Sequence, residues 1–325
     1  MNIPIVVISD NNLAFSVGTL FVNLMETKKE ETFYELNLLV TPDFTEENLK
    51  RIKSIEDTYS NKCKINIIVM DDRFSDITNK TKHISNACAY KFCIPETFPQ
   101  YDKILYLDTD IVVFEDLEEL YSVNPEDNYI AGVFSLHHYL RRRELIKLLE
   151  IPNLLKYVNA GVLIFNLDKI RKDNIVSEAV ELIGKFDDSI DQHIWNKVCF
   201  PNIKLIEPKY NVTKTNDREY QKDEVGLLAF TPKELSQISS PVIYHYTGAF
   251  KPWNTLNMRY GIIWLRYYFM SPYGHENYEH RLVPQKPKQK FAFRYKLFAL
   301  KTREICGKKF IILCIPRMKI MFKIR

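Results

Sequence analysis

Two carboxylates separated by one residue, Asp108 and Asp110, are the side chains in this sequence best placed to hold a metal ion. They follow residues 104–107, an apolar, β-prone run short enough to be a buried strand. A carboxylate inside a packed sheet is costly unless it is paired or binds a cation, so both aspartates belong at the C-terminal end of that strand. Residues i and i+2 there point to the same side, and their oxygens can converge on one hard divalent ion such as Mg²⁺ or Mn²⁺. The alternative is a polar strand end followed by a turn.

The first half of the chain carries the elements that must position these carboxylates. Strands are expected at 3–8, 36–40, 65–70 and 104–107, and helices around 17–25, 46–59 and 83–93, the last stopped by Pro95. Alternation of strand and helix is typical of a parallel, doubly wound α/β sheet, in which ligands bind beyond the C-terminal ends of the strands. Asp10, Asp71 and Asp108 all follow such ends.

The second half is less regular. Strands are expected at 130–134, 162–167 and 242–246, and helices at 139–150, 168–186 with Asp168 as N-cap, 190–198 and 257–270. Residues 208–240 show no firm periodicity and are interpreted as a long loop with short elements. Loops of this length inside a domain are usually functional lids or insertions.

Composition excludes several classes of protein. Nine glycines in 325 residues argue against flexible linkers and glycine-rich phosphate loops. The six cysteines form no CxxC pair and no cluster at zinc spacing, which favours reduced thiols in a cytosolic protein. The first ten residues lack the basic and long apolar regions of a signal peptide, and no stretch approaches the ~18 apolar residues of a transmembrane helix.

The last 45 residues differ in charge from the rest. Residues 281–325 hold fourteen Lys/Arg and one acid, a net charge of +13; the whole chain has +4, which leaves −9 for residues 1–280. Basic residues mixed with Phe, Leu and Ile suit an amphipathic helix at an anionic membrane surface. Nucleic acid and plain solvent are the alternative surroundings. We therefore expect a catalytic domain at 1–280 and a membrane-associating tail at 281–325, with no nucleic-acid partner.

Four further motifs accompany the two aspartates, and each by itself is compatible with a capped turn, a β-turn, a helix cap or a core histidine. They are Ser-Asp-Asn-Asn at 9–12, Tyr-Val-Asn-Ala-Gly-Val at 157–162, Asp-Gln-His-Ile-Trp-Asn at 191–196 and His-Tyr-Thr-Gly-Ala-Phe-Lys-Pro-Trp at 245–253. In this order and spacing the five motifs resemble glycosyltransferase family eight, the group of glycogenin and the lipooligosaccharide galactosyltransferases. The resemblance covers about residues 3–255.

The resemblance implies a single nucleotide-diphosphate-sugar-binding domain of the GT-A type, a doubly wound mixed sheet. Asp108, Asp110 and His245 would bind Mn²⁺, with Mg²⁺ as the second choice, since two carboxylates and an imidazole suit Mn²⁺ better. The implied donor-binding residues are Asp10 and Asn12 at the uridine, Gly248 and Lys251 at the diphosphate, Asn159, Asp191 and Gln192 at the sugar, and Lys91, Asp108 and Thr109.

The implied reaction moves a hexose from UDP-galactose or UDP-glucose to an acceptor hydroxyl, with retention of anomeric configuration. Gln192, with Asp191 beside it, is the implied catalytic group beneath the anomeric carbon; because an amide is a poor nucleophile, we expect attack from the same face instead of a covalent intermediate. Two departures from the family pattern are Lys91, where the family has Arg, and Leu13, where it often has an aromatic that stacks on uracil.

The acceptor is expected to be a surface glycan or a lipid-linked glycan, as in polysaccharide or lipooligosaccharide biosynthesis, met by a cytoplasmic enzyme peripheral to the inner face of the cell membrane. Two other functions stay open. A phosphatase of the haloacid-dehalogenase type also uses a strand followed by Asp-x-Asp, although normally on its first strand. A non-enzymatic membrane-binding module would need neither aspartate.

Overall fold

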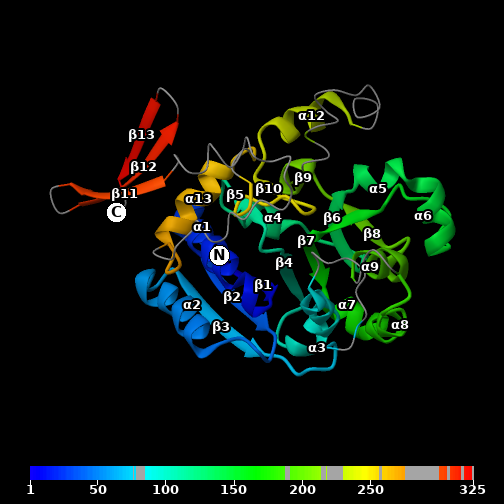
Figure 1. The fold of residues 1–325 in the computed structure, drawn as a ribbon. Coiled ribbons are helices and arrows are strands. Elements are labelled where there is room, and N and C mark those ends of the chain that lie inside the picture. Colours follow the sequence, from blue (N-terminus) through cyan, green and yellow to red (C-terminus); the bar gives the residue numbers. More distant parts are fainter. Residues whose placement is uncertain are drawn as a thin grey trace.

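The main body is a mixed α/β fold around one large sheet, seen in a computed structural model that describes residues 1–75, 77, 85–186, 191–213, 217, 230–255, 258–274, 300–305, 308–315 and 318–323. The sheet has seven strands in the order β3-β2-β1-β4-β7-β6-β8 (Figure 1). Their bounds are β1 Asn2–Ser9, β2 Phe33–Val40, β3 Cys63–Val69, β4 Lys103–Leu107, β6 Ile130–Phe134, β7 Val158–Asn166 and β8 Ile203–Leu205.

Half of this sheet is parallel, as the alternating pattern predicts. β1 pairs in parallel with β2 and β4, and β2 with β3. Successive side chains of β1 enter different cores: Ile5 and Val7 belong to one hydrophobic cluster, and Val6 and Ile8 to the other. A strand buried on both faces reads as a continuous apolar run, which is why these strands are visible in the sequence.

The other half is antiparallel. β7 runs antiparallel to both β4 and β6, while β8 pairs in parallel with β6. The whole is therefore the mixed sheet expected from the family resemblance, and β4 is its central strand. Helices α1 (Ala14–Thr27) and α2 (Glu46–Thr58) connect the parallel strands at the predicted positions.

A second, three-stranded sheet brings the end of the domain to the end of β4. It consists of β5 (Ile111–Val113), β10 (Ile243–His245) and β9 (Val212–Thr213), in the order β5-β10-β9. β5 starts directly after the Asp108–Asp110 turn, and in its antiparallel register with β10 His245 lies opposite Ile111. Asp108 and Asp110 therefore lie between two sheets, not within one continuous strand.

Short helices complete the body. They are η1 Asn11–Leu13, η2 Asn86–Cys93, α3 Ile94–Thr97, α4 Glu118–Ser122, α5 Leu136–Leu140, α6 Arg142–Leu149, α7 Leu167–Lys172, α8 Ile175–Glu181, α9 Gln192–Cys199, η3 Pro208–Tyr210, α12 Pro232–Ser239 and α13 Gly261–Met270. The expected loop at 208–240 thus contains η3, β9 and α12 in its described parts. Cys63, Cys88, Cys93 and Cys199 are free, as expected.

Two helix predictions were wrong in detail. Pro95 does not stop the helical stretch: it lies in the first turn of α3, where its missing N–H would be unpaired in any case. The single helix expected at 168–186 is two helices, because Asn174 adopts a left-handed conformation (φ 52°) between α7 and α8. The N-cap is Asn166, whose side chain accepts a hydrogen bond from the backbone N–H of Lys169, and not Asp168.

The helix expected in the tail was also wrong. Its described part forms the strands β11 (Leu300–Ile305), β12 (Lys308–Ile315) and β13 (Met318–Lys323), which pair antiparallel as a separate sheet (Figure 1). Isoleucine and phenylalanine favour strands, so the composition that suggested an amphipathic helix also suits a β-meander. Residues 281–299 lie outside the described part. None of the helices that the structure describes is long and apolar enough to cross a membrane.

Candidate functional site

The predicted metal ligands meet at the C-terminal end of β4. One ligand atom from each of Asp108, Asp110 and His245 lies within 4.8 Å of the other two. Nε2 of His245 is 3.1 Å from Oδ1 of Asp110 and 3.6 Å from Oδ2 of Asp108. The aspartates come from one turn and the histidine from the end of β10, 135 residues away along the chain. The spacing of these three atoms fits one divalent cation bound by two carboxylates and an imidazole.

Gly161 of β7 makes room for this cluster. A Cβ at this position would lie 2.2 Å from Cε1 of His245 and 2.6 Å from Oδ2 of Asp108. Its carbonyl accepts a 2.8 Å hydrogen bond from the backbone N–H of Asp108, so the two strands are locked together at the same point. The glycine in the 157–162 motif is therefore a packing requirement of the ligand set.

Lys251 approaches the cluster from the loop after β10. Its ammonium group pairs with Oδ2 of Asp110 and donates a 2.7 Å hydrogen bond to the carbonyl of Tyr246. Trp253 packs edge-on against Phe15 of α1, with ring centroids 5.5 Å apart, and so fixes this loop. Burial works to raise the pKa of Asp110, but Lys251 and His245 outweigh it and hold that pKa below its ordinary value.

Asp108 has a different environment. Its Oδ1 accepts a 2.5 Å hydrogen bond from the hydroxyl of Tyr106 and lies 4.0 Å from Nζ of Lys91. Burial raises the pKa of Asp108; Lys91 acts against this, and Asp110 adds to it. The pKa of Asp108 is thus raised while that of the neighbouring Asp110 is lowered. A cation bound between two such carboxyl groups would stabilise the charged form of both.

The resemblance implies that Lys91 contacts the donor, but in the structure its ammonium group is bonded to other parts of the protein. Its side chain is 2% exposed; it pairs with Asp191, donates a 3.0 Å hydrogen bond to the carbonyl of Ala160 and lies 4.0 Å above the ring of Tyr106. Burial works to lower the pKa of Lys91, but Asp191 and Asp108 outweigh this and raise it. Lys91 therefore joins η2, β7 and the N-terminus of α9 beneath the site.

Gln192, at the start of α9, is held through both ends of its carboxamide. Oε1 accepts hydrogen bonds of 3.0 Å from Nδ2 of Asn159 and from the backbone N–H of Ala160. Nε2 donates to the hydroxyl of Tyr157 at 3.3 Å and to Nε2 of His138 at 3.2 Å. All four hydrogen-bonding positions of the amide are thus used, and its orientation is fixed.

His138 belongs to an aromatic group behind Gln192. Its ring stacks on Tyr157 with centroids 4.9 Å apart, and its Nδ1 lies 2.8 Å from the hydroxyl of Ser135. Tyr157 also hydrogen-bonds Nδ1 of His193. Burial, followed by the nearby His193, lowers the pKa of His138 to about 3, so this imidazole is neutral at pH 7.

The other predicted donor-binding residues lie in the segments that follow β1, β4 and β10. Oδ1 of Asp10 accepts from the backbone N–H groups of Asn12 and Leu13, and Asn12 is exposed. The carbonyl of Thr109 accepts a 2.9 Å hydrogen bond from Ser16, which ties the aspartate turn to α1. Gly248 has φ +80°, so its backbone conformation is what favours glycine there.

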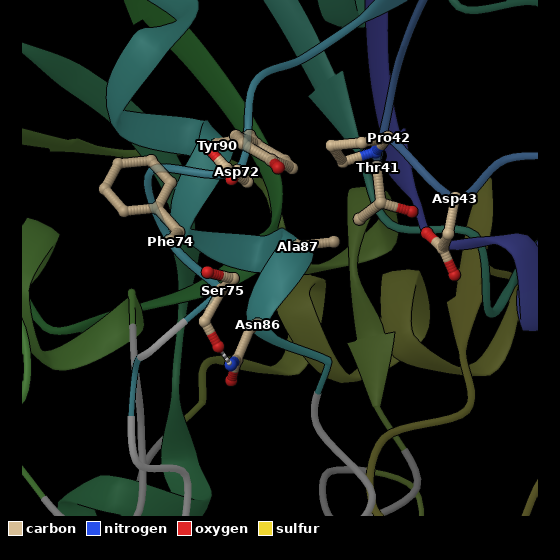
Figure 2. A pocket seen from close by; sticks show the side chains of 9 residues that line it. All are labelled: Thr41, Pro42, Asp43, Asp72, Phe74, Ser75, Asn86, Ala87 and Tyr90. Carbon is tan, nitrogen blue, oxygen red and sulfur yellow. Dashed lines mark hydrogen bonds between the residues drawn. The ribbon is translucent and has the colours of Figure 1, made fainter.

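A pocket of about 270 Å³ lies farther along the same edge of the sheet, at the ends of β2 and β3. In Figure 2, Thr41, Pro42 and Asp43 line one side, and Phe74, Asn86 and Tyr90 belong to the facing wall. The hydroxyl of Thr41 is buried and has no hydrogen-bond partner. The pocket adjoins the Asp10 loop, because the backbone N–H of Thr41 donates to the carbonyl of Ser9.

Sequence reasoning missed several residues of the site. Tyr106 had a usable signal, since it precedes Asp108 by two residues in a strand, and Gly161 lay inside a quoted motif without a role. His138 and Asn211, whose Oδ1 lies 3.0 Å from Nδ1 of His245, had none: His138 stands just before the helix predicted at 139–150, and Asn211 stands in the long loop. Their positions follow from packing, not from local pattern.

Comparison with known proteins agrees with the geometry. The family model "Glycosyl transferase family 8" matches residues 4–257. General stress protein A of Bacillus subtilis is 26% identical over 77% of this chain and 87% of its own length, and the lipopolysaccharide 1,3-galactosyltransferase of Salmonella typhimurium is 25% identical over 82% and 77%.

Solved structures share the fold. The galactosyltransferase LgtC, in complex with donor and acceptor sugar analogs, aligns with a TM-score of 0.73 at 19% identity over 86% of this chain and all of its own. The bifunctional glycosyltransferase WbbM aligns with a TM-score of 0.72 at 23% identity, over 86% of this chain and 51% of its own. At these identities the likeness establishes the GT-A fold. The match of the family model over most of the chain establishes more: this protein belongs to glycosyl transferase family 8 and is a glycosyltransferase.

Proposed function

We propose that this protein transfers galactose or glucose from a UDP-sugar to a hydroxyl of a surface-glycan or lipid-linked acceptor, with retention of anomeric configuration. The observation that carries the proposal is the convergence of Asp108, Asp110 and His245 beside Lys251. Such a group of opposite charges at the end of a central strand is suited to a diphosphate held through a divalent ion. Because the chain belongs to glycosyl transferase family 8, a phosphatase of the haloacid-dehalogenase type is no longer a candidate function.

The residues present fit Mn²⁺, with Mg²⁺ as the second choice, because the cluster offers two carboxylates and one imidazole and Gly161 leaves no side chain between them. When bound, the ion would neutralise charge on the departing UDP. Lys251 would add a positive charge on the same side and stabilise the diphosphate as its bond to the sugar breaks. Gly248, in the same loop, would let the backbone approach the phosphates.

At the sugar, Gln192 would act as a fixed neutral dipole beside the anomeric carbon, and Asn159 and Asp191 would hydrogen-bond the hexose. The full set of hydrogen bonds to Gln192 and the Lys91–Asp191 ion pair support this, because neither side chain is a free nucleophile. The acceptor hydroxyl would then attack from the face that UDP leaves. A glycosyl adduct on Gln192 or Asp191, detected by intact-mass spectrometry, would contradict this mechanism.

The nucleoside would lie past the C-terminal end of β1, running from the end of β4 toward the end of β2. β2 is two strands from β4, a distance of about 10 Å. A nucleoside attached to a diphosphate at Asp108 would pass Asp10 and Asn12 and reach the pocket of Figure 2. Leu13, in the place of the family's aromatic, packs against the core. The ring of Tyr90 in the pocket wall is our candidate for the contact with the base.

Residues 281–325 carry a net charge of +13, and we propose that they contact the anionic inner face of the cell membrane. Their described part would do so as strands and not as a helix. Sedimentation with phosphatidylglycerol vesicles tests this. Full-length protein should co-sediment at low salt and be released at high salt, whereas protein shortened to residues 1–280 should stay in the supernatant.

Thermal unfolding with ligands tests the donor. Mn²⁺ with UDP, UDP-glucose or UDP-galactose at ~100 times the dissociation constant should add about 2.7 kcal/mol to the unfolding free energy and raise the midpoint by several degrees. The rise should need Mn²⁺ and be absent from the Asp108→Asn, Asp110→Asn variant. No rise with any of the nucleotides would refute the proposed donor class.

The same unfolding experiment, repeated over a range of UDP concentrations, tests whether the pocket of Figure 2 binds the nucleoside. In Thr41→Val, which is nearly isosteric, the metal ligands are unchanged, and the buried hydroxyl without a partner is removed. If that hydroxyl contacts the nucleoside, UDP should bind several-fold more weakly while Mn²⁺ binding is unchanged. Equal UDP affinity in both proteins would place the nucleoside elsewhere.

A further inference from the structure

Asn211 is a buried polar residue that no motif includes. It follows η3, is 0% exposed, and its side chain lies between a metal ligand and a predicted sugar contact. Its Oδ1 is 3.0 Å from Nδ1 of His245, and its Nδ2 donates a 2.8 Å hydrogen bond to Oδ1 of Asn159. Asn211 therefore connects the proposed metal-binding end of the site, at His245, to the proposed sugar-binding end, at Asn159.

Backbone groups decide which way these amides point. The N–H of Gly161 can only donate, and it lies 3.1 Å from Oδ1 of Asn159. The N–H of Ala160 likewise donates to Oε1 of Gln192, which requires that Asn159 present its Nδ2 to Gln192. Asn159 must then receive Nδ2 of Asn211 at its oxygen. Each orientation in this chain is fixed by a donor that cannot be reversed.

The same reasoning reaches His245. Because Asn211 offers its amide nitrogen to Asn159, the oxygen is left for Nδ1 of His245, and an oxygen without hydrogen can only accept. Nδ1 therefore carries the hydrogen, and in a neutral imidazole the lone pair is on Nε2. Nε2 is the atom that faces Asp108 and Asp110.

We propose that Asn211 is a positioning residue that holds His245 in the tautomer able to bind a metal through Nε2, and that joins this ligand through Asn159 to Gln192. The inference rests on the proposed function for its metal: without the ion, Nε2 lies 3.1 Å from Oδ1 of Asp110, an acceptor that can hold a second hydrogen on the ring, whereas the hydrogen on Nδ1 is expected with or without the ion. A hydrogen-bond partner on the far ring nitrogen commonly orients metal-binding histidines, and its loss weakens metal binding about 10- to 100-fold.

The first test reads the tautomer without metal. In metal-free protein with ¹⁵N-labelled histidine, the His245 signals, assigned by their loss in His245→Gln, should show hydrogen on Nδ1. In Asn211→Leu, Nδ1 has lost its acceptor while Nε2 still faces Asp110, so the hydrogen should be found on Nε2. An Nδ1 without hydrogen in the wild-type protein would overturn the inference, whatever the protein does with sugar nucleotides.

The second test measures Mn²⁺ affinity by electron paramagnetic resonance. Asn211→Leu should bind about 10- to 100-fold more weakly, and Asn211→Asp, which keeps an acceptor for Nδ1 but loses the donor to Oδ1 of Asn159, should bind Mn²⁺ more tightly than Asn211→Leu. Asn37→Leu is the control, since Asn37 is also a buried asparagine (1% exposed) but lies in β2 away from the cluster.

The outcomes separate the two proposals. A folded Asn211→Leu protein that binds Mn²⁺ like wild type would overturn the role of Asn211 and leave the proposed function intact. If the wild type binds no Mn²⁺, the proposed function fails while the tautomer measurement still decides the inference. Should Asn211→Leu not fold, the wild-type tautomer provides the decision.

Discussion

The two ends of the site each contain a lysine paired with an aspartate, yet they use these pairs differently. At the metal end, Lys251 and Asp110 are both 15% exposed and stand beside other ionisable groups. At the sugar end, Lys91 is 2% exposed, pairs with Asp191 and donates a hydrogen bond to the carbonyl of Ala160. One lysine faces the place of the proposed diphosphate; the other holds secondary-structure elements together.

This difference matches the chemistry proposed for each end. Charge develops on a leaving diphosphate, so that end gathers opposite charges that can respond to it. A hexose is neutral and is recognised by directional hydrogen bonds, so that end consists of amides, hydroxyls and a neutral imidazole fixed by backbone donors. The lysine at the sugar end is buried and holds parts of the fold together, whereas the lysine at the metal end is partly exposed.

The strongest way to break the metal end is to fill the space at Gly161. In Gly161→Ala the added Cβ would lie 2.2 Å from Cε1 of His245, so the ligands must separate. We expect Mn²⁺ affinity and transferase activity to fall by more than about 100-fold, beyond the effect of losing a hydrogen-bond partner of a ligand. Isothermal titration with Mn²⁺ measures this.

Gly132→Ala is the control for Gly161→Ala. Its Cβ would meet Leu163 at 2.8 Å, a crowded contact in the core of the same sheet but away from the cluster. This variant should lose stability and keep its Mn²⁺ affinity. Normal Mn²⁺ binding by Gly161→Ala would show that the cluster is not the binding site.

An intermediate effect should distinguish the two lysines. Lys91→Met leaves the carboxylate of Asp191 buried without its partner, and we expect a loss of about 3–5 kcal/mol in the free energy of unfolding. The double variant Lys91→Met, Asp191→Asn should regain most of it. Lys251→Met should cost less stability, because Asp110 keeps His245 beside it, and should mainly reduce turnover.

Urea unfolding of these variants, together with activity assays, checks the comparison of the lysines. The structural role of Lys91 would be refuted if Lys91→Met were as stable as wild type. Equal losses of stability in the two single variants would remove the distinction between the ends.

The smallest effect concerns the neutral imidazole at the sugar end. The pKa of His138, about 3, is below its ordinary value of 6.5, so the unfolded chain takes up a proton before the folded one. Stability due to this group is present above pH 6.5 and is lost as the pH falls toward 3, by at most about 1.4 kcal/mol per pH unit.

Urea unfolding at several pH values measures this dependence. In His138→Gln, which keeps an acceptor for Gln192, the decline between about pH 6.5 and 4 should be shallower than in wild type. His137→Gln is the comparison variant: partial burial and Arg141 also lower the pKa of His137, without bringing it as far down as that of His138, so this variant should flatten the decline less than His138→Gln. A decline of the same slope in His138→Gln would show that folding does not lower the pKa of His138.

The parallel strands and the aspartate pair could be predicted because their causes are local. A strand buried on both faces needs an uninterrupted apolar run, and the end of that run marks where charge can stand. The irregular helices failed because Pro95 and Asn174 act through a single backbone position, which periodicity does not register. The tail failed because its residue types suit both an amphipathic helix and a strand.

The sequence by itself determined the fold class, the family and, through the family's motifs, the three residues predicted to bind a metal, which the structure brings together. Only the tertiary structure decided how those ligands are held: the space left by Gly161, the two different uses of Lys91 and Lys251, and the bridge from His245 through Asn211 to Gln192. The physical reason is that the orientation of this bridge depends on hydrogen bonds between residues 33 to 52 positions apart, and the bridge is complete only once the two sheets have packed together.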